Sequence, residues 1–207
     1  MLKVWGRKNS ANVQEVMWAL GELGLPHRHI NLAGAFGGNR EPSYLALNPN
    51  GLVPTIQDGD LVLWESNAIV RYLSAKYGAG TLAPADAETH ARADQWMDWQ
   101  LSVVAPAIFG LFWGLVRTPA EKRDLAAIAA SIAQTTGAMK ILDAQLGKTA
   151  FVAGEAFCMG DIPVAIMAYR FLHLVPDRPA LPHLERWFAA IEKREAFREQ
   201  VLVIPMT

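Results

Sequence analysis

The sequence predicts a two-domain fold, in which an N-terminal α/β domain with a small mixed sheet is followed by an all-α domain. Three observations predict it. Short apolar runs alternate with helical periodicity over about the first 80 residues, strand patterns vanish after residue 88, and a Gly-, Ala- and Pro-rich stretch at 78–87 separates the two regions. We therefore expect domains at residues 1–80 and 88–207.

The N-terminal region is predicted to fold as a strand–helix–strand unit followed by a β-hairpin and a closing helix. The first helical pattern begins after Ser10 and ends at Gly24. The turn of the hairpin is predicted at Asp58-Gly59. The predicted elements cover, in order, residues 2–5, 10–24, 27–32, 52–56, 61–64 and 66–78. This order is typical of a small mixed sheet covered by helices.

The C-terminal region shows only helical periodicity. Apolar side chains recur at helical spacing in four stretches, residues 88–117, 121–146, 160–174 and 181–194. Pro106 lies inside the first stretch, where we expect a kink because proline removes a backbone hydrogen bond. This region is therefore expected to be all-α.

The composition limits the class of function. Of the 207 residues 52% are hydrophobic, so the chain can bury a sizeable core, and a net charge of −1 gives no support for nucleic-acid or membrane binding. No signal-peptide pattern and no run of about 18 uninterrupted apolar residues is present, so no membrane segment is expected. Cys158 is the single cysteine, which excludes an internal disulfide and fits a cytoplasmic location.

Pro54 is unusual for its position, because it lies inside the first strand of the predicted hairpin. One interpretation is an edge strand that tolerates a proline. The other is a cis Val53–Pro54 bond, although only about 5–6% of X-Pro bonds are cis in folded proteins. A cis turn would leave the main-chain N–H and C=O of Val53 unpaired, and an extended peptide could then add there as a short strand.

Glu65 and Ser66 follow the hairpin where the next helix begins. Ser66 fits an ordinary N-cap worth about 1 kcal/mol. The same helix N-terminus also offers free N–H groups and a positive dipole end to a carboxylate, while Glu65 could receive an ammonium group. A carboxylate and an ammonium on one carbon make an amino-acid head group. The stretch from Val53 to Ser66 therefore combines a peptide-binding edge with a clamp for an amino acid.

Ser10 begins the first helix, and its hydroxyl either caps that helix or binds an anionic ligand. A capping box is absent, because Val13 stands where Glu or Gln would be. No His–Asp pattern surrounds Ser10, so a role as a hydrolase nucleophile is poorly supported.

The whole chain resembles the cytosolic glutathione transferases, and in particular their serine-type, theta-like and bacterial members. The resemblance rests on five segments that keep their order and spacing: SANVQEVMWALGELGLP, LNPNGLVPTI, LVLWESNAIVRYL, ADQWMDWQ and GDIPVAIMAYR. Its most specific feature is the Val-Pro pair followed closely by Glu-Ser. The resemblance implies a thioredoxin-like N-terminal domain and an all-α C-terminal domain, in agreement with the predicted division.

The resemblance also implies roles for individual residues. Pro54 is similar to the family's cis-proline, and the main chain of Val53 is expected to pair with the cysteinyl part of glutathione. Glu65 and Ser66 are expected to hold the γ-glutamyl head group. Ser10 is similar to the serine that stabilises the glutathione thiolate.

Further residues have counterparts in some members of the family. Asn12 is similar to an asparagine that assists in some bacterial relatives, and either Asn39 or Arg40 stands where relatives contact the glycyl carboxylate. The first tyrosine is Tyr44, far past the first helix, so a tyrosine-type enzyme is disfavoured. Cys158 replaces the Ser or Thr that usually caps a later helix in the family, and it is therefore interpreted as structural.

The activity that the resemblance implies is attack by the thiol of glutathione, a cosubstrate, on a small hydrophobic electrophile, with no metal. Alternatives on the same fold are a glutathione-dependent peroxidase, thiol transferase, isomerase or dehalogenase, or a non-catalytic binding or scaffold protein. Candidates to contact the electrophile are Phe109, Trp113, Arg117, Trp5 and Arg7, although a plain core position is the favoured interpretation of each aromatic residue. The family also implies a homodimer and a role in detoxification.

Overall fold

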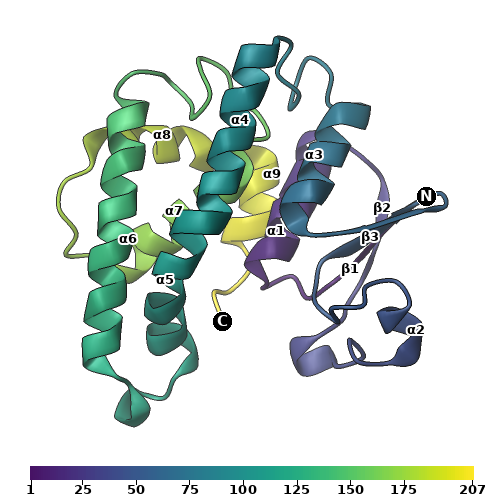
Figure 1. The fold of residues 1–207 in the computed structure, drawn as a ribbon, viewed down its shortest axis with the longest axis horizontal. Helices are drawn as coiled ribbons and strands as arrows, with labels where there is room; N and C mark the ends of the chain where they lie inside the picture. Colours follow the sequence, from purple (N-terminus) through teal and green to yellow (C-terminus); the bar gives the residue numbers. More distant parts are fainter. The chain divides into compact units, whose positions relative to one another are not determined.

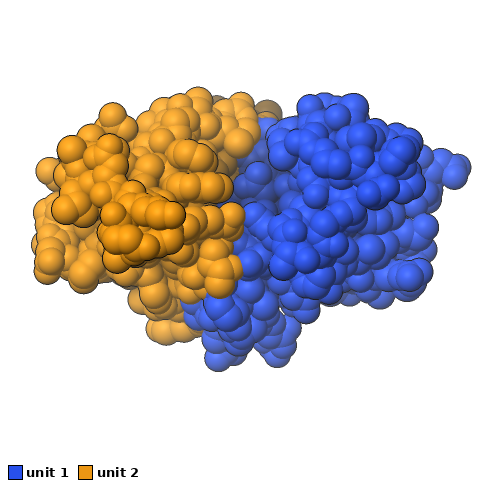
Figure 2. Space-filling view, turned by 90° about the horizontal axis from the view of Figure 1, so that it is seen from below, with its two compact units in different colours: residues 1–83, 195–205 blue, residues 84–194, 206–207 orange.

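The computed structural model describes all residues, 1–207. Contacts within the chain divide it into two units, Met1–Ala83 with Glu195–Pro205 and Pro84–Arg194 with Met206–Thr207 (Figure 2). The first unit is α/β and the second is helical, which confirms the predicted fold class.

The first unit is built on a four-stranded mixed sheet in the order β2-β1-β3-β4. β1 pairs parallel with β2 and antiparallel with β3, and β3 and β4 form the predicted hairpin. Its main elements are β1 (Leu2–Trp5), α1 (Ala11–Glu22), β2 (His27–Ile30), β3 (Thr55–Asp58), β4 (Leu61–Trp64) and α3 (Ser66–Tyr77). All six predicted elements are therefore present, with ends that differ by a few residues.

The two faces of this sheet are covered differently. α1 and α3 pack against each other on one side of the strands, where Leu2 and Val4 of β1 are buried (Figure 1). Side chains alternate along a strand, so Lys3 and Trp5 face the other side, which carries the short helix α2 (Pro42–Leu45). The sequence-based prediction missed α2 and the 3₁₀ turn Gly34–Phe36, because both are too short to show a helical period.

A segment from the end of the chain also belongs to the first unit. It contains α9 (Glu195–Phe197) and the π-helical turn Arg198–Leu202, and both contact α1. The ring of Phe197 lies 4.7 Å from that of Trp18. The domain limits predicted from the sequence placed this segment in the all-α region, and the limits of the functional domains stay a prediction.

The second unit contains only helical elements. A continuous helical stretch joins α4 (Ala87–Trp99), a π-helical segment (Gln100–Val104), α5 (Ala105–Phe112) and a second π-helical segment (Trp113–Arg117). Pro106 lies two residues after the first π-helical segment, and such bulges are where helices adjust to a proline. The remaining elements are a 3₁₀ turn (Ala120–Lys122), α6 (Leu125–Leu146), α7 (Asp161–Leu174) and α8 (Pro182–Glu192).

α7 forms the centre of the helical unit. Every residue from Asp161 to Phe171 is buried, as expected for a helix with neighbours on all sides.

Two other helical stretches, Ala87–Arg117 and Leu125–Leu146, are long and apolar enough to cross a membrane by length and composition alone. The sequence-based prediction of no such segment used a stricter criterion. Core helices of soluble proteins also pass this test, so it is weak evidence for a membrane span.

Candidate functional site

A pocket in the first unit brings together most of the residues that the sequence singled out. It has a volume of about 120 Å³. The start of α1, the loop before β3 and the junction of β4 with α3 supply its lining: Asn12, Asn48, Leu52, Val53, Pro54, Glu65 and Ser66. Three segments that are distant in the sequence therefore meet at one small cavity.

Val53 presents an open main-chain edge at this pocket. The Val53–Pro54 bond is cis, as the resemblance implies. β3 starts two residues later, at Thr55, and neither the N–H nor the C=O of Val53 has a hydrogen-bond partner in the chain. Close approach of the first loop to this edge requires Gly6, because a Cβ there would lie 2.4 Å from a methyl group of Val13 and 3.2 Å from the Cβ of Val53. The edge can thus accept a short extended peptide.

Buried polar side chains hold the loop that carries Val53. The hydroxyl of Tyr44 donates to the carbonyl of Leu52 at 2.6 Å and lies 2.8 Å from the Thr55 hydroxyl. The amide of Asn48 donates to the same two oxygens, at 2.9 and 3.2 Å. Burial raises the pKa of Tyr44, so it remains a neutral donor. The loop is therefore fixed in shape before any ligand arrives.

The sequence-based prediction missed Asn48 and Leu52 as parts of the pocket. The signal was present, because Asn-Pro-Asn-Gly at residues 48–51 is a turn sequence whose side chains bond to nearby main chain. The side-chain oxygen of Asn48 accepts a hydrogen bond from the main-chain N–H of Asn50 at 3.1 Å, and this bond closes such a turn.

Glu65 and Ser66 also line the pocket. Glu65 is exposed and has φ 71° and ψ 113°, a backbone conformation that residues other than glycine rarely adopt. Its carboxylate has no partner in the chain. Ser66 is the first residue of α3, is only 3% exposed, and likewise makes no side-chain hydrogen bond. Ser66 is thus not a side-chain N-cap, and the N–H groups at the start of α3 remain available to a ligand.

The hydroxyl of Ser10 is also unused by the protein. Ser10 occupies the N-cap position of α1 with φ −82° and ψ 128°, yet its side chain makes no capping hydrogen bond. The structure therefore does not show the capping role that was the alternative for this residue. Ser10 does not line the pocket, whereas Asn12, two residues later and exposed on α1, does.

His29 supports the loop that leads to Ser10. Its Nε2 lies 2.7 Å from the carbonyl oxygen of Gly6, and since a carbonyl only accepts, Nε2 carries a proton. Burial lowers the pKa of His29, and the nearby Lys8 lowers it further, so the neutral ring is favoured. No sequence motif indicated this residue, because the contact joins β2 to a loop before α1.

Asn39 and Arg40 lie outside the pocket lining and are tied to the turn beside it. The amide of Asn39 donates to the carbonyl of Gly51 at 2.8 Å. One N–H of Arg40 donates to the carbonyl of Asn50 at 3.2 Å, and the guanidinium is otherwise exposed. Arg40 therefore retains four N–H donors and its positive charge, whereas Asn39 retains one N–H of a neutral amide.

The remaining candidates occupy other places. Phe109 and Trp113 stack at 5.6 Å with Arg117 5.4 Å from the Trp113 ring, and the two aromatic side chains are 63% and 48% exposed, so the core interpretation was wrong for them. Burial raises the pKa of the Cys158 thiol to about 12, which agrees with a structural role. No group of three or more His, Cys, Asp or Glu side chains is placed to hold a metal ion.

Comparison with known proteins places the chain in a family. Residues 9–76 match the model of the glutathione S-transferase N-terminal domain, and residues 104–195 match that of the C-terminal domain. The chain is 42% identical to glutathione S-transferase GstB of Escherichia coli over 98% of its own length and 99% of the relative's. It is 33% identical to glutathione S-transferase 3 of Zea mays, covering 99% and 95%.

A solved structure is similar over the whole chain. It is a theta class glutathione S-transferase from Xanthomonas axonopodis pv. citri with glutathione bound, which matches with a TM-score of 0.95 and 46% identity over 100% of this chain and 99% of that one. The fold and the site thus define a thioredoxin-like domain joined to an all-α domain, with a peptide edge beside an uncapped helix start. The chain belongs to the glutathione S-transferase family, as its sequence predicted.

Proposed function

We propose that this protein is a glutathione transferase that binds glutathione in the pocket beside Val53 and activates its thiol for attack on a small hydrophobic electrophile. One observation carries the proposal. The unpaired main-chain edge of Val53 lies in the same cavity as Glu65 and Ser66, whose side chains have no partner in the chain. A γ-glutamyl peptide supplies the complementary groups, an extended backbone and an amino-acid head. The family relationship supports the same conclusion.

Each end of glutathione has a proposed contact. The γ-glutamyl carboxylate binds the Ser66 hydroxyl and the N–H groups at the start of α3, and its ammonium group binds Glu65. The cysteinyl backbone pairs with Val53 next to Pro54. We assign the glycyl carboxylate to Arg40 rather than Asn39, because the Arg40 guanidinium carries a positive charge and four free N–H donors, whereas the Asn39 amide is neutral and one of its two N–H groups already donates to Gly51.

Ser10 is the proposed thiolate-stabilising residue, with Asn12 assisting at the pocket wall. A free thiol has a pKa of about 8.5, and lowering it by about two units requires about 2.7 kcal/mol. A hydrogen bond to a charged group contributes roughly 1.5–3 kcal/mol, so the Ser10 hydroxyl near the N-terminus of α1 can supply most of this. Support comes from the free hydroxyl, which does not cap its own helix. The nucleophile is the sulfur of glutathione, and Ser10 only donates a hydrogen bond.

The thiol pKa of bound glutathione tests this assignment. Its thiolate absorbance is titrated with wild type and with Ser10→Ala, and the variant is expected to raise the pKa by about one to two units. Ser43→Ala, an exposed serine outside the pocket, is the matched control and should leave the pKa unchanged. An equal pKa in wild type and Ser10→Ala would remove Ser10 from the mechanism.

The broader proposals concern partners and location. The stacked Phe109 and Trp113 with Arg117 offer an exposed aromatic surface for a planar hydrophobic electrophile such as 1-chloro-2,4-dinitrobenzene.

We further propose a cytoplasmic homodimer with a role in detoxification, a glutathione-binding domain at residues 1–80 and a helical domain at residues 88–207. Turnover assays with this electrophile and analytical ultracentrifugation test the activity and the dimer.

A further inference from the structure

A second cavity lies on the other side of the first unit's sheet, beneath α2. It has a volume of about 310 Å³, at the lower end of the range for small-molecule sites. Its lining shares no residue with the pocket beside Val53: Trp5, Ile30, Leu32, Gly38, Glu41, Ser43, Tyr44 and Leu47. The proposed contacts with glutathione therefore lie outside this cavity, although Tyr44 in its wall also holds the loop that carries Val53.

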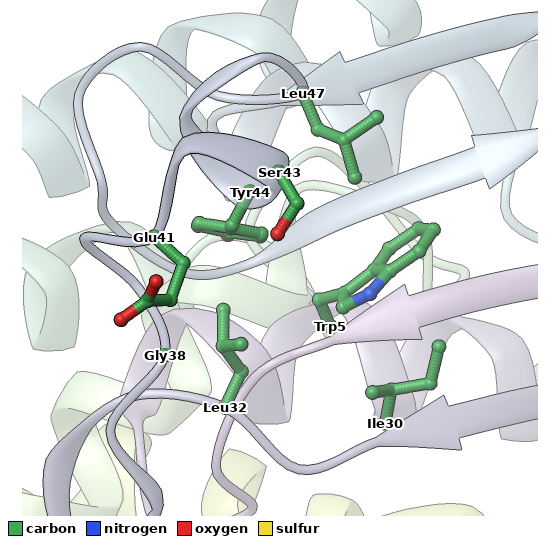
Figure 3. Close-up of a pocket in the computed structure, with 8 residues that line it drawn as sticks. All are labelled: Trp5, Ile30, Leu32, Gly38, Glu41, Ser43, Tyr44 and Leu47. Atoms are coloured by element: carbon green, nitrogen blue, oxygen red, sulfur yellow. The ribbon is translucent and has the colours of Figure 1, made fainter.

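Most of the cavity wall is apolar and only partly covered. Trp5, Ile30 and Leu32 project from the strand side, and Leu47 projects toward them from the far side (Figure 3). All four side chains are half-buried. Tyr44 adds the side of its ring, because its hydroxyl is turned to Leu52 and Thr55 and bonded there. An aromatic or similarly apolar body therefore fits the interior.

The polar groups of the cavity lie on the α2 side. Glu41, just before α2, is the only charged residue of the lining, and its carboxylate is exposed at one end of the cavity (Figure 3). It makes no ion pair or side-chain hydrogen bond in the chain. The hydroxyl of Ser43, which points into the space between α2 and Trp5, has no partner either. A ligand that reaches Glu41 must therefore carry a positive charge or hydrogen-bond donors.

From the apolar walls and the single carboxylate we infer that this cavity binds a small aromatic amine, with the ring between Trp5 and Leu47 and the ammonium group at Glu41. The ammonium group of Lys3 lies 6.0 Å from the centroid of the Trp5 ring, but it donates to Gln57 at 3.1 Å and does not line the cavity, so Glu41 remains the one charged group of the lining. The indole of Trp5 supplies a surface that attracts both rings and cations.

Titration with 2-phenylethylamine, followed by NMR of the indole N–H groups, tests the inference. The chain has seven tryptophans, and Trp5→Phe identifies the Trp5 signal by its loss. We expect a saturable shift of this signal at millimolar amine and little change in the other indole signals. Phenylacetate, which has the same ring and the opposite charge, should bind more weakly. No saturable Trp5 shift, or equal binding of the two compounds, would overturn the inference.

Two variants separate the contributions of charge and shape. Glu41→Gln should weaken amine binding about three- to fivefold, as expected for an exposed ion pair, and Ser43→Phe should abolish it by filling the cavity. Glu121→Gln, an exposed glutamate in the helical unit, is the matched control and should bind the amine like wild type. Unchanged amine affinity in both Glu41→Gln and Ser43→Phe would place the amine elsewhere.

Calorimetry on the same two variants should show wild-type affinity for glutathione. The test of the amine site therefore fails or succeeds independently of the proposed function.

Discussion

The helices α7 and α3 each have an acidic residue at their N-terminus, and the two carboxylates are used in opposite ways. At the start of α7, Asp161 is fully buried and accepts three hydrogen bonds at 3.0 Å, from the N–H groups of Val152 and Cys158 and from the indole of Trp187. At the start of α3, Glu65 is exposed, has no partner, and adopts a strained backbone conformation. One carboxylate organises the fold, whereas the other is left for a ligand.

The difference shows how a structural polar group is distinguished from a functional one. A buried carboxylate persists only when donors offset its desolvation, and Asp161 joins three segments by meeting that need. Backbone strain and unpaired polar groups do not stabilise the fold, and they concentrate at functional sites. Glu65 has the strained backbone, and the side chains of both Glu65 and Ser66 are unpaired. Asp161 has neither property, because its backbone φ is not positive and its carboxylate is fully bonded.

The largest expected effect comes from removing the buried carboxylate. Asp161→Ala leaves three buried donors without an acceptor and should lower the free energy of unfolding by about 3–5 kcal/mol. Urea denaturation at pH 7 measures this. Asp143→Ala removes a carboxylate that caps α8 from a more exposed position, and it should cost less. Equal losses in both variants would contradict the special role of burial at Asp161.

The pH dependence of stability gives the next largest effect. Burial raises the pKa of Asp161 to about 6 from an ordinary 3.8, so the folded protein binds more protons than the unfolded chain between these values. The part of its stabilisation that comes from binding this proton is therefore full below pH 3.8 and is lost as the pH rises through about 6, while the three hydrogen bonds to its carboxylate remain. We expect the stability of wild type relative to Asp161→Asn to fall by about 1–3 kcal/mol across this window in urea denaturation. A difference that does not vary with pH would show that Asp161 titrates normally.

Substitutions at Glu65 should separate strain from charge. Glu65→Gly relieves the positive φ and should raise the free energy of unfolding by about 1 kcal/mol. Glu65→Gln keeps the strain and should leave stability near wild type. Both should weaken glutathione binding by about 1–2 kcal/mol, about tenfold, because the ammonium group loses its partner. Calorimetry measures the affinity, with Asp60→Asn in the exposed hairpin turn as control. Wild-type affinity in both Glu65 variants would remove this residue from the site.

Asp58 offers the smallest effect, because it is a satisfied carboxylate near the surface. Its Oδ2 accepts from Lys76 at 2.8 Å, Tyr77 at 2.6 Å and Tyr72 at 2.7 Å. These bonds, that of Lys76 first, lower the pKa of Asp58 to about 2. Its stabilising contribution is therefore present above pH 3.8 and lost as the pH falls through about 2.

We expect Asp58→Asn to cost less than about 1 kcal/mol at pH 7, since solvent screens this network. Thermal unfolding at pH 7 and at pH 3 measures the cost, which should shrink at the lower pH. A cost as large as that of Asp161→Ala would show that exposure does not weaken such contacts.

Much of the fold was predictable because its information is local. The periodicity after Ser10, the Asp58-Gly59 turn and the absence of strand patterns after residue 88 identified the α/β region and the helical region correctly. The missed features depend on contacts between distant parts of the chain. The packing of Phe197 on Trp18 is one example, because nothing near residue 197 indicates which helix it covers.

The candidate site was predictable only as a set of residues. The sequence identified Val53, Pro54, Glu65 and Ser66, and the structure brings them into one pocket with Asn12. Their roles toward glutathione, and those of Ser10, Asn39 and Arg40, stay predictions until a complex is measured. Asn48 escaped notice because its amide acts through space, on Leu52 and Thr55, rather than through a chemical motif.

The sequence by itself determined the order of strands and helices, the family and the chemical types at the site, because periodicity, turn residues and spaced motifs are properties of neighbouring residues. Only the tertiary structure decided which polar groups are satisfied and which remain open. Asp161 and Glu65 have similar chemistry in the sequence, and their different fates follow from the donors that distant segments bring to one and withhold from the other. Hydrogen-bond satisfaction depends on where the chain returns in space, which no local pattern specifies.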